Sequence, residues 1–310
     1  MQVVRDKRRM QQEAAQWRRL GRRIGLVPTM GALHAGHLSL VERARPGCDT
    51  LVASIFVNPL QFGPQEDFQR YPRDLARDLS LLEGAGCDWV FVPETEDMVA
   101  PDATTHVAVL ALDQVLCGRS RPGHFRGVAT IVTKLFHVVQ PHVAVFGQKD
   151  AQQVLLLQRL ARDLDFDVEI RVAPIVREAD GLAMSSRNQY LGADERHDAL
   201  RLVGALRRAL ELARAGERDS SALQAAMRAE FGSGARLRLD YAEIVDTQTL
   251  QPLPRLQDRA LVAVAATVGT TRLIDNLVLE VRGEQVHEGA LPDWLPGAPR
   301  RAEIPNGAGL

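Results

Sequence analysis

The chain lacks the features that mark several large classes of protein. Its three cysteines, Cys48, Cys87 and Cys117, are odd in number and form no CxxC pair, so neither a disulfide framework nor a cysteine-based zinc site is expected. No apolar run approaches the roughly 20 residues that a membrane-spanning helix needs. The basic start is not followed by an apolar stretch of signal-peptide length. We therefore expect a cytoplasmic protein in a reducing compartment.

An excess of charge of either sign is also absent. The 38 basic residues stand against 39 acidic ones, a formal net charge of -1, so the chain as a whole has no attraction for nucleic acid or for anionic membranes. The arginine-rich start could be interpreted as a nucleic-acid arm, but Glu13, Trp17 and Leu20 interleave with it as on an ordinary surface helix. Any anionic ligand is expected to bind locally.

Strand-like and helical patterns alternate between residues 24 and 176. Helical spacing of apolar residues occurs at Leu75–Leu82, Val128–Val139 and Ala151–Leu164. The strand-like segments are Ile24–Val27, Leu51–Val57, Trp89–Val92, Val107–Leu110, Val143–Phe146 and Val168–Val172. Continuous apolar strands are typical of a parallel sheet covered on both faces. We predict an α/β fold whose first domain, residues 1–176, is a Rossmann-like, doubly wound parallel sheet.

A second, smaller α+β C-terminal domain is predicted over residues 177–281. Its expected helices are Ala199–Arg214 and Ser221–Phe231, and its expected strands are Leu237–Val245, Ala260–Val268 and Leu277–Val281. From Arg282 the chain is rich in proline, glycine and polar residues, so residues 282–310 are expected to form a disordered tail.

One segment has the residues of a phosphate site. Met30-Gly31-Ala32-Leu33-His34-Ala35-Gly36-His37 follows a strand and leads into a helical pattern, so backbone N–H groups would face one space at the carboxyl edge of the sheet. Gly31 and Gly36 allow backbone to approach phosphate, and His34 and His37 can donate N–H groups to phosphoryl oxygens. An isolated HxGH pattern could be two surface or capping histidines, but its strand-turn-helix setting favours an anion site.

A second block follows the next predicted strand. In Val57-Asn58-Pro59-Leu60-Gln61-Phe62, Asn-Pro ends the strand and Gln61 is delivered to the same edge of the sheet. A side-chain amide both donates and accepts hydrogen bonds, as recognition of a hydroxy-acid requires. The alternative is an ordinary polar loop residue.

A third block, Phe146-Gly147-Gln148-Lys149-Asp150, is again a strand followed by a glycine turn and a helix. Gly147 permits close approach to a nucleotide, Lys149 supplies a mobile positive charge, and Asp150 could cap the helix or meet ribose hydroxyls. Gln153 lies one helical turn beyond Lys149, on the same side. Without context the pattern would indicate only a polar turn.

The fourth block, Met184-Ser185-Ser186-Arg187, lies at the predicted domain junction, where Arg187 offers a planar fork of donors suited to phosphate. An ordinary serine-rich linker is the alternative. Two weaker candidates are a basic stretch and an acidic pair. The stretch, with Arg119, Arg121, His124 and Arg126, could bind an anion, and Asp74 and Asp78 could contact Mg²⁺ or cap a helix.

The HxGH block resembles that of the HIGH-type nucleotidyltransferase superfamily, whose members act on the α-phosphate of a nucleotide. A Walker A pattern and a well-placed GxGxxG are absent, which disfavours kinase chemistry and dinucleotide redox chemistry. The four blocks in this order resemble pantothenate synthetases over about residues 20–281. Ala151 departs from that pattern, because an aromatic residue is expected there.

The resemblance implies an ATP-dependent condensation of (R)-pantoate with β-alanine through a pantoyl-adenylate, releasing AMP and pyrophosphate. It implies catalytic roles for His37, His34 and Lys149, pantoate binding by Gln61 and Gln153, and β-alanine binding by Gln61. The ATP-binding residues that it implies are Met30, Gly31, Ala32, Leu33, His34, Ala35, Gly36, His37, Gly147, Gln148, Lys149, Asp150, Val176, Met184, Ser185, Ser186 and Arg187.

ATP would enter as a substrate with Mg²⁺, whose ligands the sequence leaves open. The resemblance implies a homodimer formed through the large domain, and neither nucleic acid nor membrane is expected as a partner. One alternative is a nucleotidyltransferase acting on a phosphate-bearing acceptor, which Gln61 and Gln153 disfavour because neutral amides suit a hydroxy-acid better than a dianion. Another is a nucleotide-binding regulator without turnover.

Overall fold

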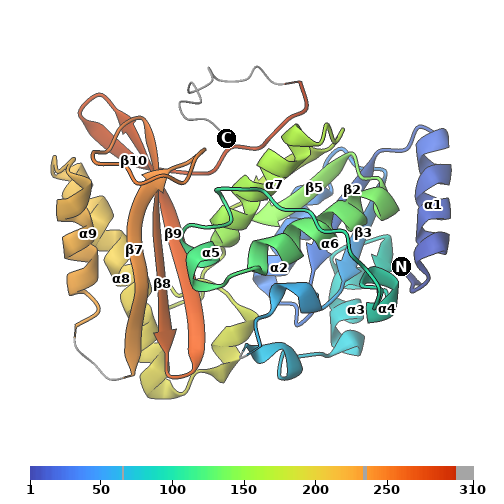
Figure 1. The fold of residues 1–310 in the computed structure, drawn as a ribbon, viewed down its shortest axis with the longest axis horizontal. Helices are drawn as coiled ribbons and strands as arrows, with labels where there is room; N and C mark the ends of the chain where they lie inside the picture. The colour runs from blue at the N-terminus through green and yellow to red at the C-terminus, as the bar shows by residue number, and fades with distance from the viewer. Residues whose placement is uncertain (65, 233–235, 298–310) are drawn as a thin grey trace.

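The computed structural model describes residues 1–64, 66–232 and 236–297 (Figure 1). Within them, the first unit is built on a six-stranded sheet in the order β1-β4-β3-β2-β5-β6, and every pairing is parallel. The strands are β1 (Gln2–Val4), β2 (Ile24–Thr29), β3 (Thr50–Ile55), β4 (Trp89–Phe91), β5 (Val143–Gly147) and β6 (Glu169–Ala173). The predicted parallel sheet is confirmed.

Helices cover both faces of this sheet. Alternate residues of its strands accordingly belong to two separate cores. Leu26 belongs to the core beneath α1 (Lys7–Arg19), α6 (His124–Val139) and α7 (Ala151–Asp163). The next residue, Val27, belongs to the core beneath α2 (Ala35–Ala44) and α3 (Leu75–Gly84). The short helices are α4 (Thr95–Met98) and α5 (Cys117–Ser120). This arrangement is the doubly wound fold expected from the sequence.

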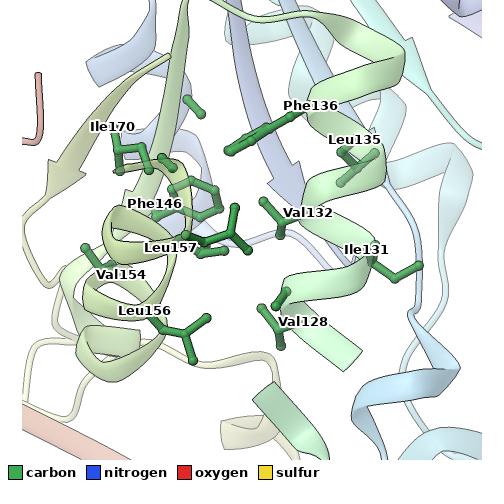
Figure 2. Packing of buried hydrophobic residues seen from close by; sticks show 14 of the residues in the cluster. Val128, Ile131, Val132, Leu135, Phe136, Phe146, Val154, Leu156, Leu157 and Ile170 are labelled. Carbon is green, nitrogen blue, oxygen red and sulfur yellow. The ribbon is translucent and has the colours of Figure 1, made fainter. Parts of the chain in front are cut away.

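The core between α6 and α7 shows why the sequence forms these helices. Val128, Val132 and Leu135 recur at helical spacing and are at most 6% exposed. Figure 2 shows Val132 of α6 lying toward Phe146 of β5 and Leu157 of α7. The apolar stripe of each helix is therefore buried against the strand whose carboxyl end leads to the turn before α7.

The second unit contains a four-stranded antiparallel sheet in the order β10-β9-β8-β7. Its strands are β7 (Leu237–Asp246), β8 (Arg259–Val268), β9 (Thr271–Arg282) and β10 (Gln285–Gly289), and its helices are α8 (Ala193–Arg214) and α9 (Ser220–Ala229). Leu273 and Leu277 of β9 pack in the core with the two helices, whereas Ile274 and Val278 pack in the core of the first unit. Figure 1 shows this sheet beside the first unit.

One predicted strand is absent from the described residues. Val107–Leu110 forms no ladder; instead the N–H of Val107 donates to Thr130 Oγ1 of α6 at 2.9 Å, and Leu110 is 75% exposed. Its apolar residues lie along a helix rather than in a sheet. Strand β1 was not predicted, because three residues carry too little periodicity to be recognised.

The structure also corrects the expected loose tail for residues 282–297. Strand β10 pairs with β9, Leu291 is buried, and Trp294 exchanges two backbone hydrogen bonds with Ile170 of β6. Apolar residues separated by glycine and proline here return the chain to the first unit. The rest of the predicted tail, residues 298–310, lies outside the described residues.

The two units are joined by residues 174–192, which include the 3-10 turn η4 (Ser186–Tyr190). A domain boundary at residue 176 remains a prediction. Three further 3-10 turns, η1 (Pro59–Gln61), η2 (Asp67–Gln69) and η3 (Gln148–Asp150), lie in the first unit. No helix in the described ranges is both long and apolar enough to cross a membrane.

Candidate active site

The site lies where the order of strands reverses. From β2 the chain continues to β3 on one side, and from β5 it continues to β6 on the other, although β2 and β5 are neighbours. Ligands of doubly wound sheets bind outside the carboxyl ends of strands at this kind of switch point. The HxGH block follows β2 and the Gly147–Asp150 turn follows β5, so the topology brings two of the predicted blocks together.

A buried carboxylate holds the turn after β2 in shape. Gly31 and Ala32 have positive φ angles of 79° and 50°, and the N–H groups of Ala32 and Leu33 each donate a 2.8 Å hydrogen bond to Asp78 of α3. A Cβ at position 31 would lie 2.9 Å from Asp78 Oδ2. Glycine is therefore required at position 31 both for its φ angle and for this close contact.

The two aspartates considered as Mg²⁺ contacts both accept hydrogen bonds from backbone instead. Asp78 is 1% exposed and is bonded as just described. Asp74 is the N-cap of α3 and accepts from the N–H of Arg77 at 3.1 Å. These contacts support the capping interpretation for Asp74. Among the described residues Asp78 caps no helix and instead holds the turn after β2.

His34 and His37 are held in one tautomer by backbone donors. The N–H of Gly36 donates to His34 Nδ1 at 3.1 Å, and the N–H of His34 donates to His37 Nδ1 at 3.3 Å. Because Nδ1 accepts in both rings, a neutral ring carries its proton on Nε2. The ring centroids lie 4.1 Å apart. The pair therefore offers two neighbouring Nε2–H donors.

Burial keeps both rings neutral at physiological pH. Burial, followed by the positive charge of Lys149, lowers the pKa of His34 to about 4. Burial, followed by the charge of His34, lowers the pKa of His37 to about 3. The neutral tautomer inferred from the hydrogen bonds is therefore the form present near pH 7.

Gln61, at the end of η1, is held on both sides. Its Oε1 accepts from Asn58 Nδ2 at 3.0 Å, and its Nε2 lies 3.0 Å from Met30 Sδ. Its backbone oxygen accepts from Arg121 at 3.2 Å and lies 2.8 Å from His124 Nδ1. Members of the basic stretch thus fix the loop that carries Gln61, which supports a loop-ordering role for Arg121 and His124.

The side chains of the turn after β5 point in different directions. Lys149, Asp150 and Gln153 line cavities, whereas the side chain of Gln148 is buried and accepts from the N–H of Leu291 at 3.1 Å. Asp150 makes no side-chain cap to α7. Ala151, where an aromatic residue was expected, is 4% exposed and packs in the core.

The Met184–Arg187 loop reaches back to the first unit. The N–H of Met184 donates to the oxygen of Val176 at 2.9 Å, and Ser186 Oγ donates to the oxygen of Ala32 at 3.0 Å. Arg187 forms a two-point ion pair with Asp67, with both bonds 2.8 Å long. The fourth block therefore lies against the turn after β2.

Two adjoining cavities, of about 230 and 510 Å³, are formed by these segments. Their walls share Arg121, His124, Lys149, Asp150, Gln153, Ser185 and Arg187. The smaller cavity is also lined by Met30, His34, Gly36, His37, Gln61, Gly147, Val176, Met184 and Ser186. The predicted site residues that line neither cavity are Gly31, Ala32, Leu33, Ala35 and Gln148. Of these, Ala32 contributes backbone contacts and Leu33 packs in the core.

Sequence reasoning missed three residues of this site. Tyr71 and Asn58 line the smaller cavity, and Asp67 lines the larger one. Asn58 stands in a block that was singled out only for Gln61, so its buried amide could have been recognised there. Asp67 and Tyr71 belong to no motif, and only their tertiary contacts with Arg187 reveal them.

A family model for pantoate-beta-alanine ligase matches residues 2–278. The chain belongs to the pantoate–β-alanine ligase family. The family and the fold class expected from the sequence are thereby confirmed.

Named members of the pantoate–β-alanine ligase family are similar to this chain over most of its length. A pantothenate synthetase of Moorella thermoacetica is 55% identical over 264 residues, which are 85% of this chain and 93% of that protein. A solved pantothenate synthetase of Thermus thermophilus is 46% identical with a TM-score of 0.84, covering 89% of this chain and 99% of that one. A Francisella tularensis pantoate-beta-alanine ligase, complexed with beta-gamma ATP and β-alanine, is 31% identical with a TM-score of 0.74, covering 89% and 97%.

Proposed function

We propose that this chain condenses (R)-pantoate with β-alanine at the expense of ATP, through a pantoyl-adenylate, and releases AMP and pyrophosphate. Family membership supports the reaction. One observation supports the proposal that both steps take place in the smaller cavity. Two histidine Nε2–H donors, the Lys149 ammonium and the amides of Gln61 and Gln153 line the same cavity of about 230 Å³.

In the first step a carboxylate oxygen of pantoate attacks the α-phosphorus of ATP. An oxygen–phosphorus bond forms to pantoate while the bond to pyrophosphate breaks. The carboxylate is already anionic, so no enzyme nucleophile or general base is needed, and catalysis consists of alignment and stabilisation of the leaving charge. We infer that His34, His37 and Lys149, which line the cavity, supply that stabilisation. Ser185, Ser186 and Arg187 line the same cavity.

Pantoate fits the part of this cavity where amides meet apolar walls. Val128, Val132 and Phe146 form part of the lining, which suits a substrate with two methyl groups. Gln61 and Gln153 would hold its hydroxyl and carboxylate oxygens, and Gln61 borders the place where β-alanine arrives. Neutral amides at both positions would disfavour an acceptor that carries a phosphate dianion.

In the second step the amine of β-alanine attacks the carbonyl carbon of the mixed anhydride. A carbon–nitrogen bond forms, AMP leaves with the electron pair of the broken bond, and the amine gives up a proton. Water would compete for this anhydride, so the site must be enclosed. We infer that the second unit, which forms much of the wall of the larger cavity, provides that enclosure.

Mg²⁺ would enter with the nucleotide, held largely by phosphate oxygens, and would neutralise part of the triphosphate charge. Among the described residues no group of three or more His, Cys, Asp or Glu side chains could hold a metal by itself, which agrees with an ion carried by the substrate. We also propose a homodimer formed through the first unit. The three cysteines, all free and buried, agree with a cytoplasmic location.

An assay of AMP formation tests the reaction. The purified protein should form AMP only when ATP, pantoate and β-alanine are all present. Pyrophosphate should still appear, in one burst per site, when β-alanine alone is omitted. A product that keeps the nucleotide, seen by mass spectrometry with no AMP formed, would contradict the proposal. Sedimentation at several concentrations tests the dimer separately.

A further inference from the structure

Strand β9 of the second unit carries two adjacent polar side chains that are buried at the junction of the two units. Asp275 and Asn276 are each 3% exposed, and successive side chains of a strand point to opposite faces. Asp275 accepts hydrogen bonds of 2.7 and 3.0 Å from Arg177, in the segment that links the units. Asn276 meets the turn before α7 instead.

Asn276 is hydrogen-bonded to the turn that carries Lys149. Its Nδ2 donates to the backbone oxygens of Gln148 and Lys149, each at 3.0 Å. Gln148 Nε2 lies 3.5 Å from Asn276 Oδ1. An amide nitrogen has two hydrogens, so both are used, and both go to successive carbonyls of one turn.

These two carbonyls belong to the two peptide planes on either side of the Lys149 Cα. Fixing both planes fixes the direction in which the lysine side chain leaves the backbone. The ammonium of Lys149 is a compact charge on a flexible stem, so its reach into the cavity depends on where that stem begins. An asparagine from the second unit therefore helps to set the position of a cation in the first.

The surroundings of Asn276 indicate that its hydrogen bonds select one relative position of the two units and do not merely hold them together. Ile274 and Val278, on the same face of β9, pack in the core of the first unit, and apolar packing alone would hold the strand there. A buried polar group among apolar neighbours is costly unless it is fully paired, and it then favours one relative position over others.

We propose that Asn276 is a positioning residue for adenylation, which couples the seating of the second unit on the first to the placement of the Lys149 ammonium. The proposal rests on the function proposed above, in which Lys149 stabilises the leaving pyrophosphate. The proposal predicts that loss of Asn276 slows adenylation and not the second step, because no pyrophosphate leaves when β-alanine attacks the adenylate.

The test compares the half-reactions in Asn276→Ala. Pyrophosphate release at saturating ATP and pantoate, followed by rapid quench, should slow by about 10- to 100-fold, the range for a reacting group displaced by about 1 Å. Attack of β-alanine on chemically prepared pantoyl-adenylate should stay within about twofold of the wild-type rate. Equal slowing of both half-reactions, or of neither, would overturn the proposal.

A double-mutant cycle with Lys149→Ala provides the decisive comparison. If Asn276 acts through Lys149, Asn276→Ala should add less than about twofold to the defect of Lys149→Ala, because residues that act as a unit are not additive. Full additivity would show that Asn276 acts elsewhere. Asn276→Asp has the same shape but places an acceptor against the two carbonyls, so it should slow adenylation selectively as well. This variant replaces Asn276→Ala in the test if the alanine variant does not fold.

Asp219→Ala is the matched control for general loosening of the second unit. Asp219 caps α9, where it accepts from Ala222 at 2.9 Å and from the hydroxyl of Ser221, and it lines neither cavity. This variant should lose thermal stability and keep both half-reaction rates. Absence of pantoate-dependent pyrophosphate in the wild type would instead refute the proposed function, so the two failures are distinguishable.

Discussion

Arg187 and Asp67 are joined by two parallel hydrogen bonds, Nε to Oδ2 and Nη2 to Oδ1, each 2.8 Å long. The guanidinium also lies 5.7 Å from the centre of the Tyr71 ring. Burial acts to lower the pKa of Arg187, but the hydrogen bonds to Asp67 raise it on balance. The cation expected to bind the triphosphate is thus already paired, and ATP must compete with a carboxylate for it.

Replacing Asp67 by asparagine should strengthen nucleotide binding. The substitution removes the competing charge and keeps the size of the side chain. We expect Asp67→Asn to tighten binding of a non-hydrolysable ATP analogue by about fivefold, or about 1 kcal/mol, measured by calorimetry. Asp163→Asn, which alters a surface pair with Arg162, should leave the affinity unchanged. Weaker binding in Asp67→Asn would show instead that Asp67 holds Arg187 in its binding position.

Loss of one imidazole donor should slow adenylation. His37→Ala removes a neutral Nε2–H that lines the cavity, and the rate of pyrophosphate release in a single turnover should fall roughly 10²- to 10³-fold. His106→Ala, at an exposed position, is the control. An unchanged single-turnover rate in His37→Ala would remove the histidine from the mechanism.

The fold should lose stability as the pH falls below about 6.5. The pKa values of His34 and His124 are lowered to about 4 and that of His37 to about 3, in each case first by burial. Between these values and the ordinary value of 6.5, the unfolded chain binds protons that the folded chain does not. The free energy of unfolding therefore falls with falling pH, and this stability is fully present only above about 6.5.

Urea unfolding at several pH values between 4.5 and 7.5 measures this slope, and His124→Asn should make it shallower. A slope that His124→Asn leaves unchanged would exclude that residue as a source. The adenylation rate should not titrate with these histidines between pH 5.5 and 8, because both catalytic rings are already neutral there. A rate that falls with a midpoint near 6.5 would contradict the assigned tautomers.

Asp78 should matter for adenylation although it lines neither cavity. In Asp78→Asn one acceptor oxygen becomes an amide nitrogen, which cannot accept from the N–H of Ala32 or Leu33. The turn would shift, and we expect the adenylation rate to fall about 10- to 100-fold. Asp74→Asn, at the exposed N-cap of the same helix, should have less than about a threefold effect. Equal effects of the two variants would show that the hydrogen bonds from Asp78 to the turn are not needed for adenylation.

Asp293 should stabilise the fold by binding the end of the described chain to the first unit. It accepts from the N–H of Val172 at 2.7 Å and pairs with Arg43 of α2 at 2.6 Å. Asp293→Ala should lower the free energy of unfolding by about 1–2 kcal/mol, measured with urea. Asp102→Ala, at an exposed position, should change it by less than about 0.5 kcal/mol. Equal stability of the two variants would mean that this contact contributes nothing.

The sequence alone determined the fold class and the polar blocks that line the smaller cavity. The strands, the helices between them and the HxGH and Gly147–Asp150 blocks are encoded by neighbours within a few residues, whose periodicity and turn chemistry are local. Once the strands are parallel, their carboxyl ends must share one edge. His37, Lys149 and Gln61 were therefore expected at that edge without coordinates, and all three line the smaller cavity. Gly31 was expected to let backbone approach phosphate, whereas the contact with Asp78 that also requires glycine there came from the structure.

Tertiary structure decided the contacts that hold those residues in place. Arg187 and Asp67 are 120 residues apart, and Asn276 is 128 residues from Gln148, so no local pattern links either pair. The same reason explains why Val107–Leu110 lies along a helix and why β10 and Trp294 return to the first unit. Periodicity reports that a segment has an apolar face, but which partner covers that face is settled only when the chain is folded.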